Sequence, residues 1–264
     1  MVSLKKAKRN AAAQSRQDLI GSMRSESKPG PVAVQDRFRS MVHVEVHDAT
    51  QERQSEIRDA AALSLSNIHN YLNALGVNLS YGNLKLIVVC DDSVKFAEVE
   101  HIAPYAFYMD EKITIKEGYI GDASTIAHEV FHFAQDTRHN LAYFDELHRA
   151  YTEAGGMFLE FAYDVLRTDT EPPNRIRMTI GDEIVDHKSL VKKFTESSRD
   201  GRALMLESIL KARIDENSQD MLDMYKNGAL FAIVAFALNE YDVGRTVRMF
   251  LELTADEAIA KLSA

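Results

Sequence analysis

The sequence predicts an α+β fold in which a strand-rich amino-terminal part precedes a helical carboxyl-terminal part. The segment Met41–His47 alternates apolar and polar residues, and Leu84–Val89 is a nearly continuous apolar run, so both indicate strands. After residue 122, by contrast, apolar residues recur mainly at helical spacing. Because strands and helices are segregated along the chain, we expect a mixed sheet, then a helical subdomain, with a cleft between them.

We expect three regions along the chain: a flexible basic tail over residues 1–38, a sheet-rich subdomain over 39–121 and a helical subdomain over 122–264. Residues 1–40 carry nine Lys or Arg against three Asp or Glu, and no hydrophobic periodicity is visible there. A solvated, disordered tail is the plainest interpretation. A transit-type segment or a non-classical export signal is the alternative.

Spacing and capping residues predict the remaining elements. Gln51–Leu75 has the spacing of a helix, whereas Ala106–Met109 and Ile113–Ile115 indicate two strands or a hairpin. Asp122 or Ser124 can cap the helix that follows. Further helices are expected over residues 144–167, 188–213, 217–240 and 243–262.

Composition excludes several classes of protein. The 264-residue chain has a net charge of −9, and its basic first segment makes the remainder more acidic still, which argues against a nucleic-acid partner. No apolar run reaches 18 residues, so we expect no membrane span. The single cysteine, Cys90, rules out an intramolecular disulfide and favours a reducing compartment. We therefore expect a cytoplasmic or otherwise intracellular protein, with export by a non-classical route left open.

The most informative motif is the segment His128-Glu-Val-Phe-His132. Its histidines are four residues apart, so on a helix both imidazoles face one side and can reach one metal ion. Glu129 is placed to accept a proton from an activated water molecule in metal-assisted hydrolysis. Apolar neighbours such as Ile126 and Val130 lie away from the histidines and form an apolar face that can pack against a core. The alternative is two histidines that merely share a helix face.

A catalytic Zn²⁺ site needs a third protein ligand and an open position. A metzincin would carry Gly three residues and His six residues after the second histidine, but Gln135 and Arg138 occupy these places. That pattern therefore fails. The candidates for the third ligand are His139, Asp145, Glu146, His148, Glu153 and Glu160.

Glu153 follows His132 by 21 residues, within Tyr151-Thr-Glu-Ala-Gly-Gly-Met-Phe-Leu-Glu160. Together with the histidine motif, this segment resembles the gluzincin metallopeptidases, and among them the aminopeptidase-N-like branch. The resemblance implies a zincin-like fold that binds one Zn²⁺ per chain. It makes His128, His132 and Glu153 the zinc ligands, and Glu160 the acid that steadies a ligating histidine. The adjacent glycine pair at 155 and 156 would let two helices approach closely.

The resemblance extends to Met224–Phe231, where Tyr225 matches the tyrosine that donates a hydrogen bond to the oxyanion. Ile113–Ile115 corresponds to the edge strand along which extended substrates pair. The Gly-x-Met-Glu-Asn segment that captures a free amino terminus in the aminopeptidases is absent, and Ala106–Lys112 stands in its place. The choice between endopeptidase and exopeptidase therefore stays open.

The residues and the resemblance together predict a zinc-dependent metalloprotease, a hydrolase whose substrate is a peptide or protein. Two alternatives stay open. One is a catalytically silent metal-binding or scaffold protein of the same fold, against which the intact Glu129 argues. The other is a regulatory or host-directed protease of narrow specificity, whose basic tail delivers it or binds a partner.

Overall fold

The computed structural model describes residues 32–46, 49–89, 106–139, 146–166, 179–180, 183–184, 187–211 and 220–264. Within these ranges, the side chains of residues 32–35, 146, 165, 179–180, 183–184, 187 and 220–226 are not described. Most of the predicted tail, together with Cys90 and Asp145, lies outside the described residues.

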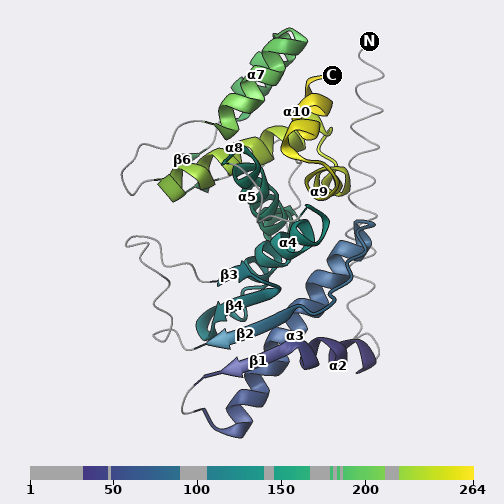
Figure 1. Ribbon diagram of the computed structural model, residues 1–264, viewed down its shortest axis with the longest axis vertical. Coiled ribbons are helices and arrows are strands. Elements are labelled where there is room, and N and C mark those ends of the chain that lie inside the picture. Colours follow the sequence, from purple (N-terminus) through teal and green to yellow (C-terminus); the bar gives the residue numbers. More distant parts are fainter. Residues whose placement is uncertain are drawn as a thin grey trace.

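A four-stranded mixed sheet supports one end of the molecule (Figure 1). Its order is β1 (Val42–Glu45), β2 (Lys85–Val89), β4 (Lys112–Lys116) and β3 (Ala106–Met109). The first three strands in this order are parallel, whereas β3 runs antiparallel to β4. Residues 110 and 111, which connect β3 to β4, both have positive φ angles, as a tight two-residue hairpin turn requires.

The two edge strands are β1 and β3, so the prediction that Ile113–Ile115 forms an edge strand is wrong. These residues belong to β4, which pairs with β2 on one side and with β3 on the other. Ile113 and Ile115 are both completely buried, as expected of apolar β-branched residues in an inner strand. Among the described strands, β3 pairs with β4 alone, so its outer backbone groups face away from the sheet.

The predicted tail over residues 1–38 extends too far along the chain, because helix α2 already begins within it and spans Val32–Met41. Phe38 on this helix is completely buried in the core. Its ring lies 5.3 Å from that of Tyr81 in an edge-on arrangement and 5.4 Å from that of His69, centroid to centroid. Phe38 could not be identified as a core residue from the sequence. Its neighbours on both sides are charged, and one buried aromatic residue creates no periodic pattern.

Replacing Phe38 with Ala should lower the free energy of unfolding by about 3–5 kcal/mol, the usual effect of emptying a buried aromatic site. Urea titration followed by circular dichroism would measure this change. Asp36→Ala, at an exposed position on the same helix, is the matched control and should change stability by less than about 0.5 kcal/mol. Equal, small effects at both positions would mean that α2 does not belong to the core.

Helix α3 (Gln51–Ala74) begins at Thr50, whose side chain accepts a hydrogen bond from the Arg53 N–H, and it is followed by Gly76 at a φ of 74°. It packs against β1, α2 and α4 (Ala123–His139). The buried apolar residues form one continuous cluster that extends from Phe38 to Ile259. The sheet-rich and helical regions of the described chain therefore share a single core.

The carboxyl-terminal half is built around two long helices, α5 (Glu146–Phe161) and α8 (Asp220–Leu238), which make extensive contact with each other. A π-helical turn, Ala162–Leu166, extends α5. The other described elements here are α6 (His187–Glu196), α7 (Arg199–Leu210), α9 (Val243–Glu252), α10 (Ala255–Ser263) and the small hairpin of β5 (Thr179–Ile180) and β6 (Glu183–Ile184).

The segments 188–213, with a break predicted at Gly201, and 243–262, predicted as one helix, are each observed as two helices. The first break precedes Gly201, which lies within α7. Ser198 caps α7 by accepting a hydrogen bond from the Gly201 N–H. Thr254 and Glu257 form a reciprocal capping box at the start of α10. These side chains satisfy backbone N–H groups that a new helix exposes, and so they favour a break where apolar spacing alone continues.

Candidate metal centre

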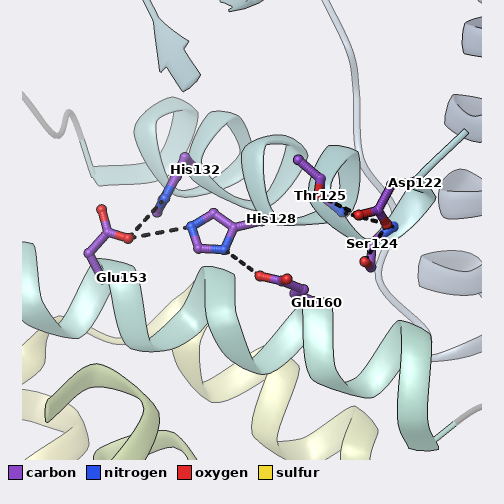
Figure 2. A network of polar contacts seen from close by, with 7 residues as sticks. All are labelled: Asp122, Ser124, Thr125, His128, His132, Glu153 and Glu160. Carbon is purple, nitrogen blue, oxygen red and sulfur yellow. Dashed lines mark hydrogen bonds and ion pairs between the residues drawn. The ribbon is translucent and has the colours of Figure 1, made fainter. Parts of the chain in front are cut away.

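The motif helix α4 is held at its start by Asp122 (Figure 2). One carboxylate oxygen of Asp122 accepts hydrogen bonds from the backbone N–H and the hydroxyl of Ser124, and the other accepts from the hydroxyl of Thr125. Because the first N–H groups of a helix lack partners within it, these bonds fix where α4 begins. The start of α4 in turn fixes the direction in which its histidines point.

The two histidines of α4 face α5, which supplies the acidic residues of the site. Glu153 Oε2 lies 3.4 Å from His128 Nε2 and 3.6 Å from His132 Nε2. On the other side of the same imidazole, Glu160 Oε2 lies 3.1 Å from His128 Nδ1 (Figure 2). Seven residues separate the two glutamates, which places them on one face of α5, two turns apart. The structure thus brings together four residues that the sequence predicted for one site.

The geometry of His128, His132 and Glu153 fits a metal ion. One ligand atom from each residue lies within 4.8 Å of the others. In a tetrahedral zinc site with bonds of about 2.0–2.1 Å, ligand atoms are separated by roughly 3.4 Å, so the observed atoms would need to shift only slightly. Glu153 Oε2 and His132 Nδ1 are also buried without a hydrogen-bond partner among the described residues. Two imidazole nitrogens and a carboxylate oxygen are a donor set typical of catalytic zinc.

The charges of the site favour a cation at the same point. Burial would raise the pKa of the Glu153 carboxyl, but the imidazoles of His132 and His128 outweigh burial and hold this pKa well below its usual range. Burial would lower the pKa of His128, but Glu153 and Glu160 outweigh it and raise this pKa. The two carboxylates therefore stabilise positive charge at the histidines. That charge can be a proton on an imidazole or a divalent ion bound between the side chains.

Glu129, the predicted proton acceptor, is largely buried, and the backbone N–H of Tyr108 in the edge strand β3 is one of the groups that act on its carboxylate. Burial raises the pKa of Glu129, whereas the two neighbouring histidines and the Tyr108 N–H oppose this rise. The two histidines of α4 and the outer strand therefore both act on this carboxylate.

The glycine pair of α5 lets the two helices approach as closely as predicted. A Cβ atom on Gly156 would lie 2.8 Å from His128 Nε2, and a Cβ atom on Gly155 would lie 2.5 Å from the Phe131 ring. Both distances are too short for a real side chain. The imidazole of His128 therefore rests directly on the backbone of α5, between the two glutamates that contact it.

Replacing Gly156 with Ala should displace the His128 ring and weaken zinc binding by about 10- to 100-fold, as changes that disturb a ligand's support typically do. Competition titration with a chromogenic chelator would measure the affinity. Gly201→Ala on α7 is the matched control, because its Cβ would meet only the exposed turn that caps that helix. Unchanged zinc affinity in the Gly156 variant would show that the ring does not need this contact.

Of the remaining candidates for the third ligand, His139 is engaged elsewhere, since its Nε2 lies 2.8 Å from the backbone oxygen of Leu251. His148 lies on α5 but is not part of the metal-binding group found among the described residues. Glu146 begins α5, and its side chain is not described.

Tyr225, the predicted oxyanion donor, belongs to α8, but its side chain lies outside the described part of the chain. It precedes Gly228 by nearly one helical turn. A Cβ atom on Gly228 would lie 3.2 Å from the backbone nitrogen of Ala154, next to Glu153, so α8 passes close to the metal-binding part of α5. The role of Tyr225 stays a prediction.

Sequence reasoning missed Tyr108 and Asp136. The Tyr108 hydroxyl donates a hydrogen bond of 2.6 Å to Asp136 Oδ2 on α4, in addition to the contact of its backbone with Glu129. Neither residue lies in a recognisable motif. Tyr108 lies in the predicted strand over Ala106–Met109, but no feature of the sequence indicated a role for Asp136.

Comparison of the chain with known protein families, with characterised proteins and with solved structures gives no match. Function is therefore inferred from the described residues themselves. Within the described ranges, no helix has both the length and the apolar character needed to cross a membrane.

Proposed function

We propose that the protein is a zinc-dependent metallopeptidase of the gluzincin type. The observation that carries this proposal is the convergence of His128, His132 and Glu153 from two helices, with the buried Glu129 next to His128 in the sequence. His128 and His132 would hold the ion through their Nε2 atoms, and Glu153 would hold it through Oε2. A site built only for structural metal binding would have no need of the buried carboxylate of Glu129 beside its ligands.

When bound, a zinc ion supplies a Lewis acid that polarises the scissile carbonyl and acidifies water. Glu129 accepts a proton from the attacking water and then passes it to the leaving amine. Glu160 accepts a hydrogen bond from His128 Nδ1, which fixes the tautomer and keeps Nε2 available as a ligand. Tyr225 is proposed to donate a hydrogen bond to the oxyanion.

The substrate is proposed to be an extended peptide that binds along β3. This strand pairs with only one described neighbour, and it lies beside α4, as Figure 1 shows. An extended peptide can add to such an edge through backbone hydrogen bonds, which do not depend on the peptide's sequence. Side-chain preference would then arise from residues around the site rather than from the strand itself.

Metal analysis combined with a peptide-library digest tests the proposal. We expect about one zinc ion per chain, loss of cleavage on chelation and recovery when zinc is added back. Cleavage products identified by mass spectrometry would also distinguish endopeptidase from exopeptidase activity. A folded protein that contains no divalent metal and takes none up would refute the proposal. Zinc at one ion per chain without cleavage of any peptide would favour the silent scaffold instead.

A further inference from the structure

Two residues of α4 contact the side chain of Tyr108 in the edge strand. Asp136 accepts a hydrogen bond from its hydroxyl, and the ring of Phe133 lies 6.1 Å from its ring in an edge-on arrangement. Counted from Glu129, Phe133 and Asp136 are at i+4 and i+7, so the three residues form one stripe along the helix. The backbone N–H of Tyr108 also acts on the Glu129 carboxylate.

The bond between Tyr108 and Asp136 is the outer anchor of this arrangement. It is short, at 2.6 Å, and its acceptor is a carboxylate, the combination that gives the stronger class of hydrogen bonds. Burial and the contact with Asp136 raise the pKa of Tyr108, so the hydroxyl stays protonated and remains a donor at neutral pH. The same hydroxyl accepts a 3.3 Å bond from the Glu111 N–H in the hairpin turn, so the anchor also fixes the end of β3.

We propose that Tyr108 and Asp136 are positioning residues for Glu129. Their hydrogen bond fixes β3 on α4, so that the Tyr108 N–H holds one oxygen of the Glu129 carboxylate. The other oxygen is then left to accept the proton. This inference rests on the proposed hydrolytic function for the role of Glu129, but the coupling between the two contacts can be measured without any substrate.

Amide hydrogen exchange at residue 108, followed by NMR, tests the coupling directly. The N–H points away from its only described partner strand, and the proposal predicts that it is still protected because it donates to Glu129. Tyr108→Phe keeps the ring but removes the hydroxyl, and we expect exchange at residue 108 to accelerate about 10-fold. Asp136→Ala should have a similar effect and Asp136→Asn a smaller one, since a neutral amide oxygen still accepts a weaker bond.

A double-mutant cycle separates positioning from general loosening of the strand. In a Glu129→Ala background, the N–H of residue 108 has already lost its acceptor, so Tyr108→Phe should accelerate its exchange little further. Tyr241→Phe, whose ring packs edge-on against Phe236 in another part of the molecule, is the matched control and should leave exchange at residue 108 unchanged. Equal acceleration in both backgrounds would overturn the inference.

Kinetics supply the functional half of the test. Tyr108→Phe should lower kcat roughly 10-fold, with KM and zinc content nearly unchanged, because it disturbs the proton acceptor and not the ligands. An unchanged kcat, or unchanged exchange at residue 108, would overturn the inference even in an active peptidase. Failure of the wild-type protein to cleave any peptide is a different result, and it would count against the proposed function.

Discussion

Replacing Glu129 with Gln is expected to remove most peptide hydrolysis while leaving the fold and the metal in place. Gln has nearly the same shape, and its amide oxygen can still accept a hydrogen bond. It cannot, however, accept a proton from water. We therefore expect kcat to fall by about 10²- to 10⁴-fold. Steady-state kinetics on a peptide found in the library digest would measure this loss.

Two controls make the Glu129 result specific. Zinc content and melting temperature of the variant should match those of the wild type, because Glu129 is not among the proposed ligands. Glu252→Gln, at an exposed position on α9, should leave kcat unchanged. If the Glu129 variant hydrolyses peptides at the wild-type rate, another group accepts the proton and the proposed mechanism is wrong.

Replacing Glu153 with Ala is expected to produce the opposite pattern, in which the metal itself is lost. Glu153 supplies the only carboxylate oxygen of the described ligand group, and it approaches both histidines from α5. Without it, two imidazoles remain, which leaves a zinc ion short of protein ligands. The affinity should fall by more than the roughly 10- to 100-fold typical of losing a partner outside the ligand set.

Chelator competition on two α5 variants and one control on α9 would rank the acidic residues of α5. Glu153→Ala should bind zinc most weakly, and Glu160→Ala should show an intermediate loss, because Glu160 contacts only the far nitrogen of His128. Glu252→Ala should bind zinc normally. Normal binding by the Glu153 variant, with loss on substitution of Glu160 or His139, would replace the proposed ligand set with a different one.

Features that depend on short-range patterns could be predicted from the sequence. The helix over residues 51–75, the strand over 84–89 and the hairpin after residue 106 are all observed within one or two residues of their predicted bounds. The four-residue spacing placed His128 and His132 on one helix face, and the resemblance to the gluzincins added Glu153, which the structure brings near both histidines. Each of these inferences needed only local periodicity or a known spacing.

Features that depend on the arrangement of distant segments could not be predicted. The strand β3 forms an edge because β2 pairs with β4. More than twenty residues separate β2 from β4 in the sequence, so no local pattern reveals this pairing. The anchoring of α2 depends on Phe38 reaching Tyr81 and His69. The contact between Tyr108 and Asp136 joins a strand to a helix 28 residues later. In each case the decisive neighbour is remote, and composition does not reveal it.

The close contact at Gly155 and Gly156 means that the two faces of α4 should tolerate substitution very differently. The apolar face packs against side chains, which can exchange for others of similar volume and settle into new rotamers. The histidine face lies on main-chain atoms, which cannot be exchanged and have no rotamers to adjust. We therefore expect the apolar core positions of related chains to vary among residues of similar volume, while a few positions where α4 crosses α5 stay unchanged.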